Sequence, residues 1–219
     1  MMHKTVQNLI DIEKKINFNL DNFKPNKIPK IIAVSKTFSM DKIIPLIEYG
    51  HSDFGENKVQ EAIDKWTNVK SNKNINLHLI GSLQTNKVKF AISLFDYIHS
   101  VDSHKLAKKI FDEQQKQNKK VKIFIQVNIG NEKQKSGISK SALPELYSYC
   151  KGLNLDVVGL MCIPPLGQST ENYFKEMNIL NQNFNFSELS MGMSADYLEA
   201  AKNSATYLRI GSNIFGERS

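Results

Sequence analysis

Short apolar runs alternate with longer amphipathic segments along almost the whole chain. The apolar runs are rich in Ile, Val and Leu and end in polar turns, a pattern that is typical of buried strands. The longer segments place apolar residues three or four positions apart, as on one face of a helix. The pattern predicts strands at residues 31–37, 53–56, 76–81, 97–101, 121–129, 155–163, 188–191 and 207–211.

Helices are predicted between these strands and once before them. Their ranges are 3–20, 41–49, 57–69, 85–94, 103–117, 139–151, 170–183 and 194–204. Strict alternation of strands and helices indicates a parallel sheet covered by helices, and eight strands suit a closed (β/α)8 TIM barrel. An open doubly wound sheet is the alternative, but it usually carries a glycine-rich turn after its first strand, and residues 35–40 contain no glycine. We therefore expect a single α/β barrel domain over residues 1–219, with 3–20 as an extra N-terminal helix.

Composition narrows the class of protein further. The 219 residues are 41% hydrophobic and 23% charged, as in an ordinary globular protein, and no apolar run approaches a membrane span. The net charge is +7, but the lysines are scattered and not interleaved with aromatics, so we expect no nucleic-acid partner and no membrane partner. Cys150 and Cys162 lack metal-ligand spacing, so we expect no metal and a reducing, cytoplasmic location.

The first predicted strand ends in a lysine. Side chains alternate along a strand, so Ile32, Val34 and Lys36 are expected on one face. A lysine on the core side at the carboxyl end of a strand would lose hydration and become a nucleophilic amine, as a Schiff base with an aldehyde requires. The alternative is a lysine whose ammonium simply reaches solvent at the end of the strand.

The last two predicted strands are each followed by glycine and serine, as Gly192 and Ser194 and as Gly211 and Ser212. In TIM barrels the loops after strands seven and eight often bind a phosphate, through backbone N–H groups and hydroxyls. A single glycine of this kind could equally serve only to form a tight turn. Two such turns on neighbouring strands favour an anion site.

Arg209, one of only two arginines in the chain, lies inside the eighth predicted strand. The first and eighth strands are neighbours in a closed barrel, so Lys36, Arg209 and the anion site are expected to share one ligand. Pyridoxal 5′-phosphate (PLP) has an aldehyde for a lysine, a ring nitrogen for a partner such as arginine, and a phosphate. The pattern therefore predicts PLP as cofactor.

Several motifs in this order resemble those of the pyridoxal phosphate homeostasis proteins, whose fold is similar to the N-terminal barrel of alanine racemase. The resemblance spans the whole chain. The motifs are Ala33-Val34-Ser35-Lys36-Thr37, Phe54-Gly55-Glu56-Asn57 with Val59-Gln60-Glu61, His78-Leu79-Ile80-Gly81-Ser82-Leu83-Gln84-Thr85-Asn86-Lys87, Lys135-Ser136-Gly137, Gly159-Leu160-Met161, Leu189-Ser190-Met191-Gly192-Met193-Ser194 and Arg209-Ile210-Gly211-Ser212 with Ile214-Phe215-Gly216.

The resemblance implies a role for nine residues. Lys36 would form the Schiff base with PLP, and Arg209 would face the pyridine nitrogen. The other seven would divide between the phosphate and the ring: Ser194, Gly211 and Ser212 would hold the phosphate, while Asn57, His78, Ser190 and Met191 would line the ring.

The resemblance also implies a carrier or regulator of vitamin B6 with no catalytic residues, a monomer that passes PLP to apo forms of PLP-dependent enzymes. The alternative is a PLP-dependent amino-acid racemase. Racemisation needs acid/base groups on both faces of the cofactor, and a tyrosine serves the second face in the racemase that this barrel resembles. Tyr97 and Tyr207 start strands and so are expected at the wrong end of the barrel.

Lys135, in the loop 130–138, could reach the cofactor or remain a solvated loop lysine.

Overall fold

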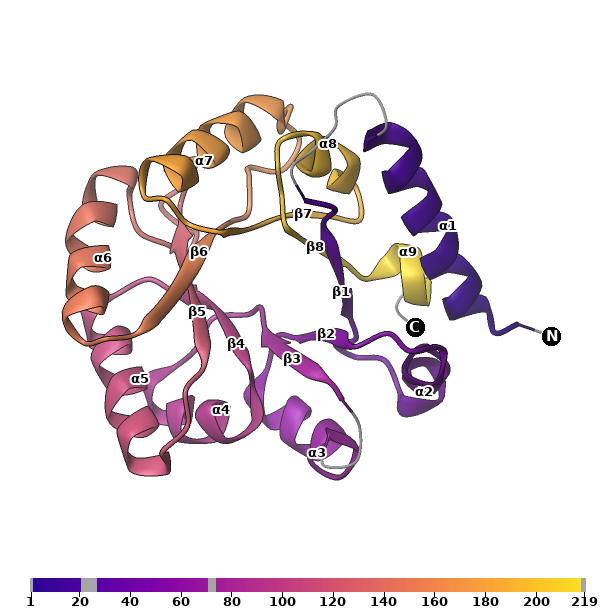
Figure 1. Cartoon of the computed structure of the whole chain (residues 1–219), viewed down its shortest axis with the longest axis horizontal. Coiled ribbons are helices and arrows are strands. Elements are labelled where there is room, and N and C mark those ends of the chain that lie inside the picture. Colours follow the sequence, from indigo (N-terminus) through magenta and orange to yellow (C-terminus); the bar gives the residue numbers. More distant parts are fainter. Residues whose placement is uncertain (1, 21–26, 71–73, 218–219) are drawn as a thin grey trace.

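The chain forms a closed barrel of parallel strands surrounded by helices (Figure 1). The computed structural model describes residues 2–20, 27–70 and 74–217. Arg218 and most of residues 21–29, which separate the predicted N-terminal helix from the first predicted strand, lie outside these ranges. Strand order follows the sequence from β1 to β8, and β1 pairs with β8 to close the ring. The predicted TIM-type barrel is therefore confirmed, and the open sheet is excluded.

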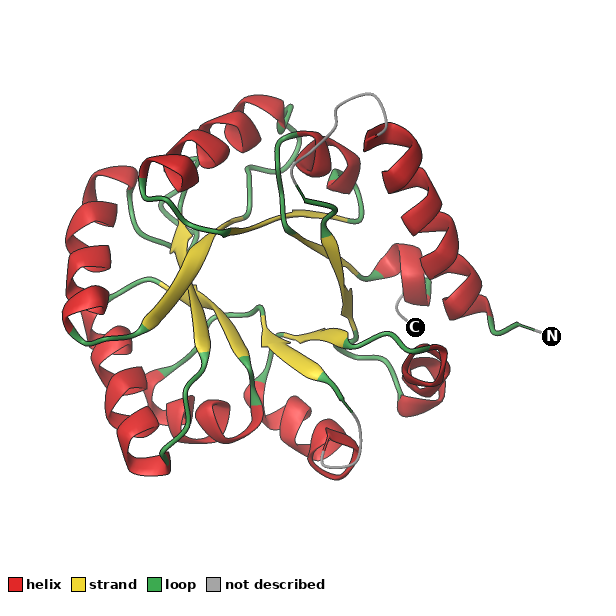
Figure 2. Ribbon diagram, in the orientation of Figure 1, coloured by secondary structure: helices red, strands yellow, loops and turns green. Residues whose placement is uncertain are grey.

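The strands lie inside and the helices outside (Figure 2). The strands are β1 (Lys30–Val34), β2 (Asp53–Glu56), β3 (Asn76–Leu79), β4 (Tyr97–Val101), β5 (Lys122–Val127), β6 (Asp156–Cys162), β7 (Glu188–Met193) and β8 (Tyr207–Ile210). The α-helices are α1 (Lys4–Leu20), α2 (Met40–Tyr49), α3 (Val59–Lys70), α4 (Val88–Leu94), α5 (His104–Gln117), α6 (Leu143–Gly152), α7 (Glu171–Asn183), α8 (Tyr197–Lys202) and α9 (Ser212–Phe215), with 3₁₀ turns at Thr85–Lys87 and Lys140–Ala142.

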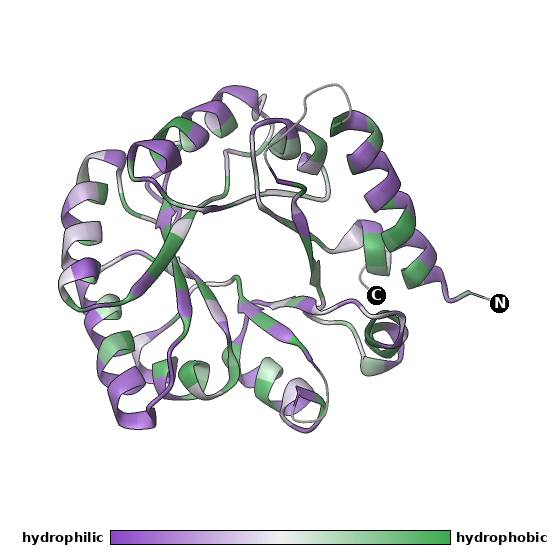
Figure 3. Ribbon diagram, viewed as in Figure 1, coloured by the Kyte–Doolittle hydropathy of each residue, from purple (hydrophilic) through white to green (hydrophobic). Residues whose placement is uncertain are grey.

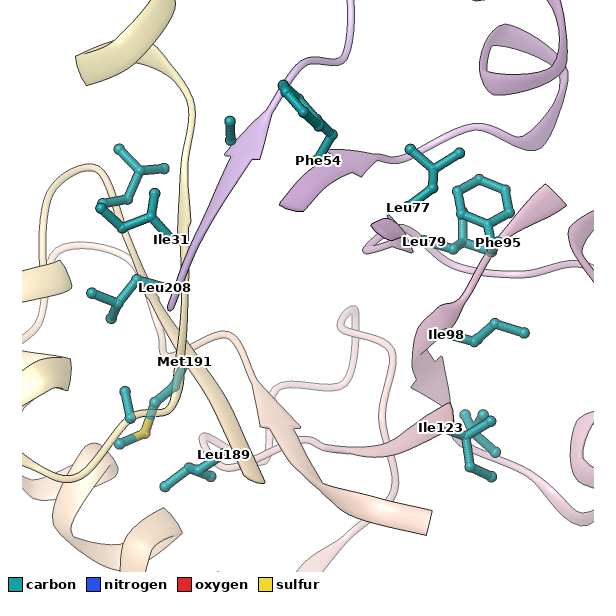
Figure 4. Close-up of a cluster of buried hydrophobic side chains, with 14 of the residues drawn as sticks. Ile31, Phe54, Leu77, Leu79, Phe95, Ile98, Ile123, Leu189, Met191 and Leu208 are labelled. Carbon is teal, nitrogen blue, oxygen red and sulfur yellow. The ribbon is translucent and has the colours of Figure 1, made fainter. Parts of the chain in front are cut away.

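The larger hydrophobic core lies between the barrel and its helices. Figure 4 shows side chains of this core, among them Ile31, Phe54, Ile98, Leu189 and Leu208, turned away from the barrel axis. Each outer helix carries both hydrophilic and hydrophobic residues (Figure 3), because only one face of it packs on the strands. Within the described ranges, no helix is long and apolar enough to cross a membrane.

The barrel interior holds a second, smaller cluster. It contains Ile32, Tyr97, Phe124, Met161 and Tyr207, all buried. Tyr97 and Tyr207 begin β4 and β8, as predicted, and Lys122 and Lys30 lie over their rings at the amino ends of the strands. These aromatics fill the interior of the barrel at its N-terminal end.

Several predicted boundaries differ near the carboxyl ends of the strands, and three of these differences concern the candidate site. β1 stops at Val34, so Lys36 lies in a turn beyond the strand, because Thr37 adopts a left-handed backbone with φ of 67°. The helix expected from residue 194 begins at Tyr197, after a turn that contains Ser194. No helix is predicted after residue 211, but the structure has the short helix α9 there, which packs beside α1 (Figure 1).

Candidate cofactor-binding site

The turns after β1, β7 and β8 meet at the carboxyl ends of the strands, the C-terminal mouth of the barrel. Ile32 of β1 pairs with Arg209 of β8, and Met193 of β7 pairs with Arg209 from the other side. A Cβ atom placed on Gly211 would lie 3.4 Å from Val34, so the β8 turn packs directly on the end of β1. The barrel closure thus places the segment of Lys36 beside both predicted phosphate turns.

Lys36 is half-buried in a turn whose backbone is anchored on both sides. Before it, the Ser35 N–H donates to the carbonyl oxygen of Gly55 at 3.0 Å. After it, the Thr37 N–H donates to Oε1 of Glu61 at 2.5 Å. A left-handed threonine costs of the order of 1 kcal/mol or more, and the Glu61 hydrogen bond offsets part of it. The turn that carries the lysine is therefore fixed by neighbouring elements.

A buried carboxylate supports the same turn from beneath. Glu56, fully buried at the end of β2, accepts hydrogen bonds from Ser35 Oγ at 2.7 Å and from Trp66 Nε1 at 3.0 Å. Lys65 of α3 pairs with Glu56 at 3.0 Å and also donates to the carbonyl oxygen of Ser35 at 2.9 Å. Sequence reasoning missed these positions because nothing in the linear pattern connects Glu56 or Lys65 to the lysine turn.

Arg209 lies below the mouth, almost completely buried in the barrel interior. Its NH1 donates to Ser190 Oγ at 2.7 Å, and its NH2 donates to the carbonyl oxygen of Cys162 at 2.8 Å. Burial lowers the pKa of the guanidinium from its usual very high value. An arginine held on two edges presents its remaining N–H groups in a fixed direction.

The two predicted phosphate turns are joined by hydrogen bonds. The Gly211 N–H donates to Ser194 Oγ at 3.2 Å, and Asn213 Nδ2 donates to the carbonyl oxygen of Ser194 at 2.9 Å. Because Ser194 Oγ accepts from Gly211, its own hydrogen can be given to an anion. The N–H groups of Ser212 and Asn213 open α9, where the first N–H groups have no partner within the helix. Hydroxyl and N–H donors therefore converge between β7 and β8.

Asn57 follows β2 at the same mouth. Its Oδ1 is buried and makes no hydrogen bond to any described residue. A Cβ atom on Gly81 would lie 2.2 Å from the carbonyl oxygen of Asn57, so only glycine allows this close approach of the two turns. A buried acceptor without a donor costs about 1–3 kcal/mol, which a ligand with a hydrogen-bond donor could recover.

The other three residues predicted to line the ring are His78, Ser190 and Met191. His78 is completely buried and pairs in register with Tyr97, the first residue of β4, on whose ring it stacks at 4.3 Å. The hydroxyl of Ser190 is hydrogen-bonded to Arg209 and to His99. The side chain of Met191 belongs to the helix-facing core (Figure 4). Lys36, Asn57, Ser194, Gly211 and Ser212 thus lie in turns at the mouth, Arg209, Ser190 and His78 lie below it in the barrel interior, and Met191 faces the helices.

Lys135 lies in the loop after β5, beside a cavity of about 270 Å³ that Gly81, Asn128 and Ser136 also line. Its ammonium pairs with Glu132 at 2.5 Å and donates to the carbonyl oxygen of Pro164 at 3.0 Å. These contacts tie the loop to the turn after β6 and do not bring Lys135 to the phosphate turns. Among the described residues, no group of three or more His, Cys, Asp and Glu side chains gathers as a metal site.

Comparison with known proteins agrees with this geometry. Residues 12–219 match the family described as the alanine racemase N-terminal domain. The chain is 38% identical over 199 residues to the pyridoxal phosphate homeostasis protein of Aquifex aeolicus, covering 86% of this chain and 87% of that one. It is 34% identical over 232 aligned residues to the protein of the same name from Vibrio alginolyticus, covering 99% of both.

Solved structures show the same relationship. PipY of Synechococcus elongatus aligns with a TM-score of 0.81 at 33% identity without PLP, and with a TM-score of 0.77 at 31% identity with PLP bound; each covers 92% of this chain and 100% of that chain. Alanine racemase of Clostridium difficile aligns with a TM-score of 0.72 at 17% identity over 92% of this chain and 56% of its own, which shows a shared fold. The barrel, the lysine turn and the full-length similarity together place this chain in the pyridoxal phosphate homeostasis protein family.

Proposed function

We propose that this chain binds PLP at the C-terminal mouth through Lys36 and acts as a carrier or regulator of the cofactor. The observation that carries the proposal is the convergence, across the β8–β1 seam, of the anchored lysine turn, the buried guanidinium of Arg209 and the joined turns of Ser194 and Gly211. The PLP-bound structure of PipY supports it.

The residues present fit PLP. When bound, PLP supplies an aldehyde that condenses with a lysine amine, a ring and a phosphate. Lys36 supplies the amine, and the Glu56 and Glu61 contacts hold its backbone in place. Ser194 and Ser212 donate to the phosphate, and Arg209 keeps the ring nitrogen unprotonated because a guanidinium can only donate.

The same geometry supports a protein that holds PLP without racemising amino acids. A racemase needs a second acid/base group opposite the lysine. Tyr97 and Tyr207 lie at the other end of the barrel, where their hydroxyls are 3.4 Å apart. The other five tyrosines lie on helices: Tyr49 on α2, Tyr147 and Tyr149 on α6, Tyr173 on α7 and Tyr197 on α8. We infer that the chain works as a monomeric single domain and releases PLP to apo forms of PLP-dependent enzymes.

The test is an absorbance titration of the purified chain with PLP, followed by borohydride reduction and peptide mapping. We expect a visible band, and covalent PLP on the peptide that contains Lys36. Lys36→Ala should lose the band and the label. Lys30→Ala is the matched control, because Lys30 begins the same strand at the opposite end of the barrel. Label on another lysine, or no band in the unaltered chain, would overturn the assignment.

The racemase alternative is tested separately. The PLP-loaded chain is incubated with L-alanine and other L-amino acids, and the products are separated by chiral chromatography. We expect no D-isomer beyond that formed by PLP alone. Lys36-dependent turnover in the range of ordinary enzymes, roughly 1–10³ s⁻¹, would favour the racemase.

A further inference from the structure

A continuous line of hydrogen bonds crosses the barrel interior from Arg209 toward the opposite mouth. NH1 of Arg209 lies 2.7 Å from Ser190 Oγ, which lies 2.9 Å from Nδ1 of His99. Nε2 of His99 lies 2.9 Å from Nδ1 of His78, and Nε2 of His78 lies 3.0 Å from Oδ1 of Asp53. The five residues come from β8, β7, β4, β3 and β2, so the line joins widely separated parts of the barrel wall.

The aromatic side chains of the interior fix the two imidazole rings. His78 stacks on Tyr97 at 4.3 Å, and His99 stacks on Phe124 at 4.2 Å. Both histidines are completely buried, as is Ser190. The rings therefore have little freedom to turn away from their hydrogen-bond partners.

The two ends set the direction of every hydrogen in the line. Arginine can only donate, so Ser190 Oγ accepts from Arg209 and gives its single hydrogen to Nδ1 of His99. His99 then carries its hydrogen on Nε2 and donates to Nδ1 of His78. His78 likewise carries its hydrogen on Nε2 and donates to the carboxylate of Asp53. Each group is satisfied with both imidazoles neutral, and the hydroxyl hydrogen of Ser190 is not available to a ligand.

The electrostatics of the buried groups agree with these protonation states. Burial lowers the pKa of His78, and burial together with the charge of Arg209 lowers the pKa of His99 well below its usual value. Burial alone would raise the pKa of Asp53, but hydrogen bonds from His78 and Ser52 and the charge of nearby Lys30 outweigh it, so the pKa is lowered. Apolar residues of similar volume often stabilise a protein core as well as buried charged groups do, which favours a positioning role for this array.

We propose that Asp53, His78 and His99 are positioning residues for Arg209, and that the carboxylate of Asp53 accepts the last hydrogen of the line. The line holds NH1 on Ser190 while the carbonyl oxygen of Cys162 holds NH2. Two anchors on different nitrogens fix the plane of the guanidinium, and its other N–H groups stay directed at the ligand. The proposal rests on the proposed function only in that PLP is the ligand Arg209 faces.

The direction of the line is tested first on the full chain without PLP. Two-dimensional ¹⁵N NMR of the histidine side chains at neutral pH distinguishes the tautomers. We expect a protonated Nε2 and an unprotonated Nδ1 for both His78 and His99, with no titration near the usual pKa of histidine. A hydrogen on Nδ1 of either ring, or an imidazolium, would overturn the proposal whether or not the chain binds PLP.

The effect on Arg209 is tested with His99→Phe, which keeps an aromatic ring of similar size and removes both nitrogens. We expect the dissociation constant for PLP to rise about tenfold, as for one lost charge-assisted hydrogen bond, and the visible band to shift. The matched control is His104→Phe, because His104 is on the exposed surface of α5 with a side chain 45% accessible. A folded His99→Phe variant with unchanged affinity and spectrum would refute the positioning role.

Asp53 offers a variant that keeps the fold and the acceptor. Asp53→Asn retains a carbonyl oxygen for His78, so PLP affinity should stay close to that of the unaltered chain, whereas Asp53→Leu leaves the buried Nε2–H of His78 without an acceptor and should raise the dissociation constant for PLP. If Asp53→Leu binds PLP as tightly as Asp53→Asn, Asp53 does not help to position Arg209. If the unaltered chain shows the expected tautomers but takes up no PLP, the proposed function fails and the hydrogen-bond line stands.

Discussion

The buried carboxylate of Glu56 offers the sharpest test of how the lysine turn is held. Glu56→Ala removes the acceptor of Ser35 Oγ and Trp66 Nε1 and leaves the ammonium of Lys65 without its buried partner. Glu56→Gln keeps one acceptor oxygen for the two neutral donors and removes only the charge. The two variants therefore separate the ion pair from the neutral hydrogen bonds.

The expected losses of unfolding free energy follow from how deeply the two charged groups are buried. The side chain of Glu56 is inaccessible and that of Lys65 is 10% accessible, so solvent screens their interaction weakly. Breaking such a pair by removing one partner costs about 3–5 kcal/mol. Lys65 keeps contacts with Glu61 and with the carbonyl oxygen of Ser35, which places the expected loss for Glu56→Ala near the lower end, about 3 kcal/mol. We expect about 1–2 kcal/mol for Glu56→Gln, the scale of a hydrogen bond to a charged group.

The assay is urea unfolding followed by tryptophan fluorescence, since the single tryptophan, Trp66, contacts Glu56 directly. Glu171→Gln is the matched control, because Glu171 and Lys175 form an exposed ion pair on α7, and it should leave the unfolding free energy unchanged. The same variants should slow the borohydride-trapped reaction of PLP with Lys36 in the order Ala, then Gln, then unaltered. Equal stability of Glu56→Ala and the unaltered chain would refute the reasoning.

Three further outcomes are expected. The pKa values of His51, His78 and His99 are lowered by burial, so below about pH 6.5 the unfolded chain takes up protons that the native chain does not. Each histidine should therefore lower the unfolding free energy by up to about 1.4 kcal/mol per pH unit as the pH falls further. Urea unfolding at pH 7.5 and pH 5.5 measures this, and His99→Phe should make the unfolding free energy depend less on pH. Arg209→Glu should retain some PLP but shift its absorption band, because an acidic partner protonates the ring nitrogen; an unchanged band would show that Arg209 does not contact the ring. Lys135→Ala should change the rate of PLP transfer to an apo-enzyme more than the affinity, because its loss frees the loop from Pro164 and Glu132; equal transfer rates would leave Lys135 as an ordinary loop lysine.

The architecture was predictable because the spacing of hydrophobic residues distinguishes strands from helices. Alternating strand and helix patterns gave all eight strands, and the carboxyl ends of β1, β7 and β8 had to meet once the barrel closed. Lys36, Ser194 and Gly211 lie in loops at those ends, so their order in the sequence was enough to bring them together.

The interior contacts depend on information that the linear pattern lacks. Strands in a barrel are tilted and staggered, so the height of His78 depends on its register with Tyr97. The expectation that Ser190 and Met191 both line the ring conflicts with strand geometry, because adjacent residues face opposite sides. The sequence did contain one signal for His99. It is a polar residue inside an apolar strand, and it lies two positions from Tyr97, hence on the same face.

The closing seam of the barrel also has a consequence for synthesis of the chain. Asn8 of α1 donates to the carbonyl oxygen of Ile214 in α9, a contact between residues 206 positions apart, and β1 finds β8 across a similar span. Neither contact can form until β8 and α9 have been synthesised, so the phosphate turn after β8 reaches the lysine turn long after β1 itself has been made. The binding site lies where β1 and β8 meet. A ligand that contacts both strands would therefore stabilise the closed barrel relative to partly folded chains.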